Sequence, residues 1–147
     1  MKKIIIVILF LILGQQFFAQ KYPIKSDLNS SSQNTMAYEI LEEIEMGISK
    51  TDLAAISPHL SSHIYLSFLN GVSGYYSANQ AFYVLENFFK EYKVTSFMFD
   101  SFNFNTVTPF AKGTYNYEHK GNRSEAKVYL TMKLTGKSWK ITQISIN

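Results

Sequence analysis

The C-terminal part of the chain alternates apolar and polar side chains with a period of two. A strand is the element that places alternate residues on opposite faces, so this pattern predicts strands with one buried face. Gly121 and Gly136 separate successive stretches at positions typical of tight turns. The stretches are residues 94–105, 110–119, 124–134 and 138–146. We therefore expect the domain to end in four consecutive antiparallel strands.

The residues before position 94 show helical spacing instead. Apolar side chains recur three and four positions apart within residues 35–49, which predicts an amphipathic helix that Gly47 helps to end. Thr51 is expected to cap a short second helix. Ser77, followed three residues later by Gln80, has the spacing of a capping box and predicts the start of a third helix.

Two shorter strand-like stretches, residues 63–68 and 73–76, lie between the second and third helices. Helices that gather early in a chain and are followed by a meander of strands predict an α+β fold. Aromatic residues make up 16% of the chain, and they suit a curved sheet whose concave side must be filled. We expect three helices packed in a curved, mainly antiparallel sheet that forms a cone.

The N-terminus has the composition of a secretory signal peptide. Lys2 and Lys3 precede an unbroken apolar run at positions 4–13, in the order that signal peptides show. This run is too short to span a bilayer, which needs about 20 residues. Cleavage is expected after Ala19, and an uncleaved membrane anchor is the alternative.

This expectation divides the chain into three parts. Residues 1–19 form the signal peptide, residues 20–34 a flexible linker and residues 35–147 the folded domain. The chain contains no cysteine, which excludes a lipidated cysteine, a disulfide framework and a cysteine-ligated metal. We expect an exported protein, periplasmic or secreted, with no membrane anchor after cleavage.

The formal net charge of the chain is +3, and it is smaller without the predicted signal peptide. Without Lys2 and Lys3, 12 basic residues (14 less 2) face 11 acidic ones, and this balance indicates no nucleic-acid binding. Residues 26–100 carry nine acids and three lysines, whereas residues 101–147 carry seven basic residues and two acids. Two solvated faces would explain this asymmetry, and so would a basic sheet face that meets an acidic partner.

The order of the predicted elements resembles the nuclear transport factor 2-like superfamily over residues 35–147. The landmarks of that likeness are the entry to the third helix and the closing strand. They read Tyr75-Tyr76-Ser77 and Gly136-Lys137-Ser138-Trp139-Lys140-Ile141. The resemblance implies the conical α+β fold of that superfamily.

More narrowly, the chain resembles a family of small exported proteins from Bacteroidetes that is known only as a domain of unknown function (DUF4783). The likeness rests on Tyr76-Ser77-Ala78-Asn79-Gln80-Ala81, Val84-Leu85, Phe88-Phe89-Lys90, Gly113-Thr114-Tyr115, Val128-Tyr129-Leu130 and Lys140-Ile141-Thr142-Gln143-Ile144. The chain departs from the family by having only Gly121 and Arg123 where a glycine- and arginine-rich hairpin is usual. The resemblance implies a fold and an exported location, and it implies no reaction.

The wider superfamily includes ketosteroid-isomerase-like enzymes. Their chemistry needs a carboxylate base on the first strand and a tyrosine paired with an acid that together stabilise an oxyanion. The base position falls near Ser67 and the tyrosine position near Ile44. Neither side chain can take that role, so we expect no enzyme of this type.

His59 and His63 are four residues apart, a spacing that would place two metal ligands on one face of a helix. Pro58 indicates instead that they lie at a helix end and a strand start, and no third ligand is evident. No serine has the surroundings of a nucleophile elbow. We therefore expect no metal, no cofactor and no acyl-transfer chemistry.

The aromatic side chains admit two interpretations. They fill a core, or they line a pocket for a small apolar ligand. Asp100 would orient such a ligand if it faces the cone, and it would be solvated if it faces outward. The candidate pocket residues are Tyr65, Phe88, Phe89, Phe99, Asp100, Tyr115 and Tyr117.

The leading hypothesis is an exported, non-enzymatic domain. It binds either a small apolar ligand in the cone or a protein partner through the sheet. One alternative is a divergent enzyme that uses Asp100 or Tyr65 as acid or base. Another is a homodimeric structural subunit that associates through aromatic residues on the outer face of the sheet.

Overall fold

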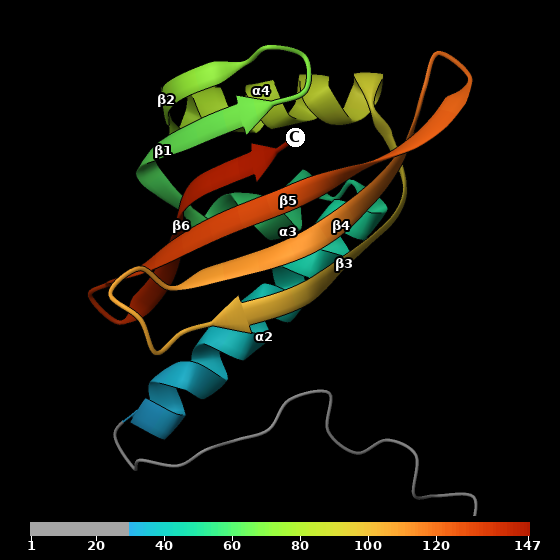
Figure 1. Ribbon diagram of the computed structural model, residues 1–147. Coiled ribbons are helices and arrows are strands. Elements are labelled where there is room, and N and C mark those ends of the chain that lie inside the picture. Colours follow the sequence, from blue (N-terminus) through green and yellow to red (C-terminus); the bar gives the residue numbers. More distant parts are fainter. Residues whose placement is uncertain (1–29) are drawn as a thin grey trace, which may run out of the picture. The chain divides into compact units, whose positions relative to one another are not determined.

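The computed structural model describes residues 30–147 (Figure 1). The predicted signal peptide and most of the predicted linker, residues 1–29, lie outside the described residues. The elements in chain order are α2 (Ser30–Lys50), α3 (Leu53–Ile56), the 3₁₀ helix η2 (Ser57–His59), β1 (Leu60–Phe68), β2 (Ser73–Ser77), α4 (Ala78–Glu91), β3 (Lys93–Asn103), β4 (Phe110–His119), β5 (Asn122–Thr135) and β6 (Ser138–Ile146).

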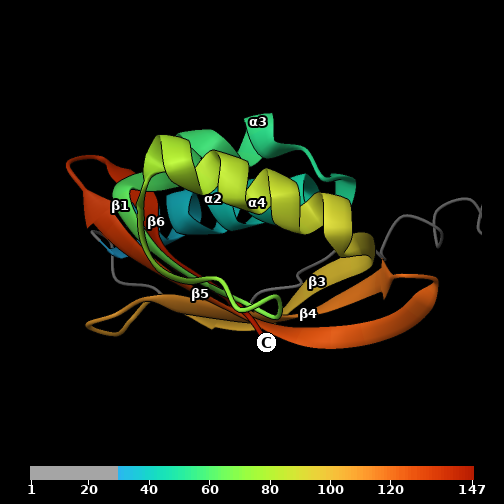
Figure 2. The same ribbon diagram turned by 90° about the horizontal axis from the view of Figure 1, so that it is seen from above.

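The strands form one six-stranded sheet in the order β2-β1-β6-β5-β4-β3. Strands β1 and β6 pair in parallel, and the other neighbouring strands of the described chain pair antiparallel. The helices cover one face of this sheet, which curves beneath them (Figure 2). The predicted α+β fold, with its closing meander of four strands, is confirmed.

A bulge in β3 brings Phe102 onto the covered face with Phe97 and Phe99. The register of β3 against β4 shifts between Phe99 and Ser101, so the extra residue Asp100 breaks the alternation. As a result Phe102, which strict alternation from Phe99 would place on the open face, pairs opposite the buried Ala111. Asp100 itself is exposed on the face away from the helices.

The structure corrects three predictions at the first two helices. α2 begins at Ser30, within the predicted linker, and continues past Gly47 to Lys50. Gly47 is buried because α3 packs against it, and a Cβ there would lie 2.7 Å from Cγ1 of Ile56. The N-cap of α3 is Asp52 rather than Thr51, and its Oδ1 accepts hydrogen bonds from the amides of the next turn. Thr51 instead makes the sharp turn between the helices, with a φ of 56°.

The capping box at the start of α4 is confirmed. The Ser77 hydroxyl accepts a hydrogen bond from the Gln80 amide at 3.3 Å, and the Gln80 side chain accepts one from the Ser77 amide at 2.9 Å. This exchange satisfies two amides that a helix start would otherwise leave unpaired. It fixes the point at which the chain leaves β2 and lays the apolar side of α4 onto the sheet.

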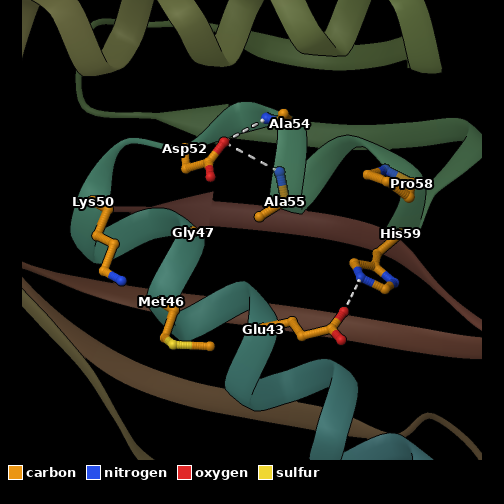
Figure 3. Close-up of a pocket in the computed structure, with 9 residues that line it drawn as sticks. All are labelled: Glu43, Met46, Gly47, Lys50, Asp52, Ala54, Ala55, Pro58 and His59. Carbon is orange, nitrogen blue, oxygen red and sulfur yellow. Dashed lines mark hydrogen bonds and ion pairs between the residues drawn. The ribbon is translucent and has the colours of Figure 1, made fainter.

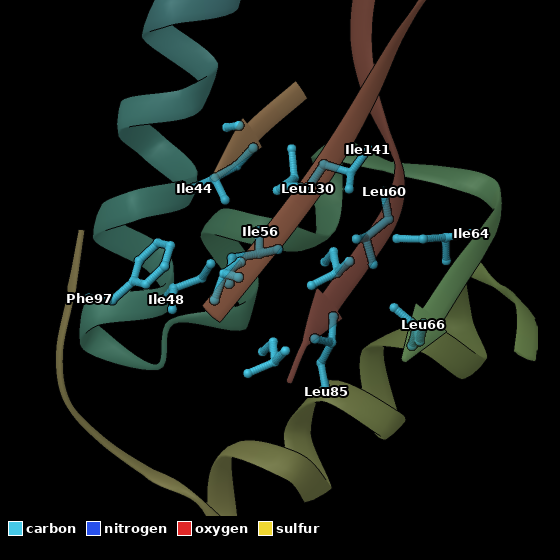
Figure 4. Close-up of a cluster of buried hydrophobic side chains, with 14 of the residues drawn as sticks. Ile44, Ile48, Ile56, Leu60, Ile64, Leu66, Leu85, Phe97, Leu130 and Ile141 are labelled. Atoms are coloured by element: carbon cyan, nitrogen blue, oxygen red, sulfur yellow. The ribbon is translucent and has the colours of Figure 1, made fainter. Parts of the chain in front are cut away.

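The core fills the space between the helices and the curved sheet. Aliphatic side chains of α2, α3 and α4 meet those of β1, β5 and β6, including Ile44, Leu85 and Ile141 (Figure 4). Aromatic rings occupy the side toward β3 and β4, where Phe88 and Phe89 lie 6.0 and 6.1 Å from the ring of Tyr115. In the described part of the chain, no buried side-chain nitrogen or oxygen lacks a hydrogen-bond partner.

Tyr115 is fully buried among these rings. Its hydroxyl donates a hydrogen bond to the main-chain oxygen of Tyr92, at the end of α4, over 2.6 Å. Burial raises the pKa of Tyr115 above its ordinary value because the charged phenolate would lose its hydration. The neutral phenol therefore joins β4 to the end of α4 from inside the core.

Strand β3 is an edge of the sheet, and two side chains of α2 occupy its outward backbone groups. The Glu45 carboxylate accepts a hydrogen bond from the Phe99 amide at 2.7 Å. One helical turn later, the Ser49 hydroxyl donates to the Phe97 carbonyl at 3.1 Å. An open edge strand invites pairing with other chains, so these contacts protect β3 as well as attach α2 to the sheet.

Replacing Glu45 with alanine should lower the free energy of unfolding by about 1–3 kcal/mol, because the half-buried Phe99 amide loses its acceptor. Urea denaturation followed by circular dichroism measures this difference. Glu42→Ala is the control, since Glu42 is exposed on the same helix and should change stability by less than about 0.5 kcal/mol. Equal losses in the two variants would contradict the role of Glu45.

Tyr115→Phe should alter how stability depends on alkaline pH. The unfolded chain releases this proton near pH 10, whereas the folded protein retains it because its pKa is raised. The stabilisation is therefore full below about pH 10 and is lost as the pH rises toward the folded pKa. Between about pH 10 and 12 the native chain should lose up to about 1.4 kcal/mol per pH unit more than the variant. Urea denaturation at each pH measures the free energy of unfolding. If this free energy falls equally with pH in the native chain and in the variant, the prediction is wrong.

Candidate functional site

Most of the predicted pocket residues share one aromatic cluster in the structure, but that cluster is packed core, and Tyr65 and Asp100 lie apart from it. Four of them lie in the core, with exposed fractions of 4% or less: Phe88, Phe89, Phe99 and Tyr115. Their rings pack against one another and against neighbouring core side chains, and Phe99 lies 4.8 Å from the ring of Phe97. None of the hollows described below is lined by Phe88, Phe89 or Tyr115.

The other three predicted residues are half-buried or exposed. The hydroxyl of Tyr65, on β1, is 2.9 Å from the Ser73 hydroxyl. Tyr117 is half-buried at the margin of the core cluster, with its ring stacked 5.9 Å from that of Tyr115 and 5.4 Å from that of Tyr92. Asp100 faces outward, and its Oδ2 accepts a hydrogen bond from Thr114 at 2.8 Å. Of the two orientations considered for Asp100, the structure has the solvated one.

The outer face of the sheet, which we define as the face opposite the helices, carries two aromatic clusters. Tyr65 and Tyr75 form one on β1 and β2, with ring centres 5.1 Å apart, and Tyr75 is 79% exposed. Phe110 and Tyr129 form the other on β4 and β5, stacked at 5.7 Å. The Lys112 ammonium lies 5.3 Å from the centre of the Phe110 ring, close enough for a cation–π contact.

Polar groups connect three strands beside the second cluster. Lys127 Nζ lies 3.3 Å from a Glu125 carboxylate oxygen and donates to the Thr114 hydroxyl at 3.2 Å. Thr114 in turn donates to Asp100, so the chain of contacts runs from β5 across β4 to β3. A hollow of about 450 Å³ lies here, lined by Asp100, Ser101, Lys112, Gly113, Lys127, Val128, Tyr129, Ser145 and Asn147. The outer face thus combines aromatic surface with cations and hydroxyls.

A second hollow, the α2–α3 hollow, lies on the helical side (Figure 3). Its volume is about 440 Å³, and it is lined by Glu43, Met46, Gly47, Lys50, Asp52, Ala54, Ala55, Pro58 and His59. His59 Nε2 lies 2.8 Å from a Glu43 carboxylate oxygen across the hollow's rim. Sequence reasoning missed this site because Glu43 and His59 are 16 residues apart and no periodic pattern links them.

A third hollow of about 610 Å³ lies beside the loop between β3 and β4. Phe104, Met132 and Trp139 line it, and all three are buried. Val107 is fully exposed on the loop. The apolar surface open to a ligand here therefore comes mainly from the loop itself.

His59 and His63 lie on different elements, η2 and β1. His59 meets Glu43, while His63 is exposed on its strand. Within residues 30–147, no group of three histidine, cysteine or acidic side chains is placed to hold a metal ion. No helix in this part of the chain is long and apolar enough to cross a membrane.

Solved structures with the same fold come from several bacteria. A DUF4783 family protein from Bacteroides uniformis is 18% identical, with a TM-score of 0.65 over 72% of this chain and 94% of its own. One from Bacteroides ovatus is 19% identical, with a TM-score of 0.62 over 71% and 90% of the two chains. An NTF-2 like protein of unknown function from Shewanella oneidensis is 13% identical, with a TM-score of 0.56 over 77% and 97%.

These TM-scores show a shared fold, and they confirm the predicted likeness to the nuclear transport factor 2-like fold. No curated protein matches the sequence. The sequence itself matches the family described as a domain of unknown function (DUF4783) over residues 41–147. Because that match spans most of the chain, the protein belongs to the DUF4783 family.

Proposed function

We propose that this chain is an exported, non-catalytic binding domain that holds an acidic protein partner on the outer face of its sheet. The observation that carries the proposal is the outer face itself. Its two aromatic clusters lie on a surface that the fold does not need to cover, and Tyr75 is almost fully open to solvent. Aromatic surface flanked by cations is typical of interaction sites.

The charge of the chain favours an acidic partner. Lys112 and Lys133 are exposed on β4 and β5, and in the described residues neither forms an ion pair with an acid. Near the second cluster, two acids share this face, but Glu125 pairs with Lys127 and Asp100 accepts a hydrogen bond from Thr114. The exposed acids Glu39, Glu42 and Glu43 lie instead on α2. An acidic segment would therefore be attracted to the sheet and repelled by the helix.

A small apolar ligand inside the domain has less support. The side chains expected to line its pocket are packed against one another, which leaves the core without the space such a ligand requires. The divergent enzyme that would use Asp100 or Tyr65 as acid or base also has less support, because Asp100 is exposed on the outer face and not in an enclosed cavity. Three strands separate β1, which carries Tyr65, from β3, which carries Asp100, so the two strands are about 19 Å apart across the sheet and neither side chain would assist the other.

A homodimer through the outer face is the second candidate, because the same aromatic clusters would suit it. Near the second cluster, however, the outer face carries three lysines, Lys112, Lys127 and Lys133, against two acids, Asp100 and Glu125, so two copies face to face would bring together surfaces with the same excess of positive charge. Like charges across an interface cost free energy unless acids intervene. The acidic partner is therefore preferred, and the crosslinking experiment below distinguishes the two.

A photo-crosslinking amino acid in place of Tyr129, on the outer face, should form an adduct of one defined mass in the producing cells. The same substitution at Tyr83 is the control, since Tyr83 is 63% exposed on α4. Adding Lys112→Glu should lower the adduct yield at position 129 by at least about tenfold, because like charges would then meet.

Mass spectrometry of the adduct identifies the partner. An acidic protein crosslinked from position 129 and not from position 83 supports the proposal. An adduct of twice the chain's mass would replace it with the homodimer. Crosslinking only from position 83 would overturn the outer face as the binding surface.

Export has its own test. The protein recovered from the periplasm or the medium should begin at Gln20, because cleavage after Ala19 removes the predicted signal peptide. Intact-mass measurement and N-terminal sequencing detect this directly. Recovery of a chain that retains the apolar run in the membrane fraction would support the uncleaved anchor instead.

A further inference from the structure

The α2–α3 hollow has an apolar middle between two charged ends. Gly47 and Ala55 form its floor where α2 and α3 approach each other, and Met46 stands beside them with 53% of its surface exposed (Figure 3). An exposed methionine is a flexible apolar side chain that adapts to what it covers. The volume of about 440 Å³ falls within the range of small-molecule pockets, about 300–1,000 Å³.

One end of the hollow is lined by one carboxylate and one ammonium. Asp52 uses Oδ1 for the amides of Ala54 and Ala55, at 3.0 and 3.3 Å. Its second oxygen points away from those amides, toward Gly47 (Figure 3). Lys50 lines the same end, with its side chain directed away from Asp52 (Figure 3), and in the described chain no ion pair joins Lys50 to any acid. A carboxylate and an ammonium so arranged complement the head group of an α-amino acid, which carries the same two charges reversed.

The other end carries a carboxylate in a fixed position. Glu43 is bonded to His59 through one oxygen at 2.8 Å. The His59 side chain is only 15% exposed, whereas that of Glu43 is 57% exposed. Packing therefore holds the imidazole, the imidazole orients the carboxylate, and the second carboxylate oxygen can accept a hydrogen bond from a ligand.

We infer that the α2–α3 hollow binds a basic α-amino acid of the length of lysine. The head group contacts Lys50 and Asp52, the methylene chain lies over Gly47 and Ala55, and the distal ammonium reaches Glu43. With His59 counted as neutral, the lining carries two negative charges and one positive charge. A ligand of net charge +1 neutralises this site. The inference is independent of the proposed partner, which binds the opposite face of the sheet.

L-lysine is the probe, titrated into the ¹⁵N-labelled protein and followed by amide chemical shifts. Three analogues each lack one of the contacted groups. Norleucine lacks the distal ammonium, 1,5-diaminopentane lacks the carboxylate, and 6-aminohexanoate lacks the α-ammonium. L-lysine should produce saturable shifts at the residues of the hollow, and each analogue should bind about tenfold more weakly, the loss expected for one charge-assisted contact.

Variants of Glu43, Lys50 and Asp52 test which group of the ligand each of these side chains contacts. Glu43→Gln keeps a partner for His59 but removes the charge, so it should abolish the preference for L-lysine over norleucine. Lys50→Met should abolish the preference for L-lysine over 1,5-diaminopentane. Asp52→Ser retains a helix cap and should abolish the preference over 6-aminohexanoate. Glu42→Gln is the control, since Glu42 is exposed on α2 outside the hollow, and it should leave all affinities unchanged.

Equal affinity of the native protein for L-lysine and norleucine would overturn the inference. Chemical-shift changes that map to other surfaces would also overturn it. So would the absence of saturation at about 100 mM L-lysine, which is about 100 times a millimolar Kd. Amide spectra of each variant show directly whether it remains folded. A folded Glu43→Gln protein that still prefers L-lysine over norleucine would likewise refute the assignment of Glu43.

Discussion

The hydrogen bond between the Glu45 carboxylate and the Phe99 amide fixes the relation between α2 and the sheet. With Ser49 bonded to the Phe97 carbonyl, it closes an edge strand and holds the helix over the aromatic side of the core. Two backbone groups that would otherwise be open to another chain are satisfied from within the molecule. The position of α2 then decides where α3 packs, and therefore where the α2–α3 hollow lies.

This attachment also explains why the covered face of the sheet makes a poor ligand site. Once α2 and α4 lie on the sheet, the rings of Phe88, Phe89 and Tyr115 pack against one another and against neighbouring aromatic rings, which fills the covered side. The Tyr115 hydroxyl is occupied by the end of α4. The surfaces with unused binding capacity are accordingly the outer face and the α2–α3 hollow, where charged and aromatic groups remain accessible.

Much of the fold could be predicted because its signals are local. Alternation of apolar and polar residues within single strands predicted the meander. The spacing of Ser77 and Gln80 predicted the start of α4, where the two residues exchange hydrogen bonds. Predictions failed where a distant segment decides the outcome. Gly47 looks like a helix end in the sequence, but it is glycine because Ile56 of the next helix approaches it. The candidate site was predicted less well than the fold. Its predicted residues lie in the packed core, at the margin of that core near the end of β4, and on the outer face.

The sequence by itself determined the classes of element, the family and the amphipathic faces, because periodicity reports which side chains share a face of one helix or strand. Only the tertiary structure decided which faces meet. The bulge at Asp100 is the clearest instance, since one extra residue turns Phe102 inward and leaves the carboxylate outside. Pairing between strands sets such a bulge, and the order of residues within one strand does not specify it. Likewise, Glu43 and His59 became neighbours only when η2 packed against α2.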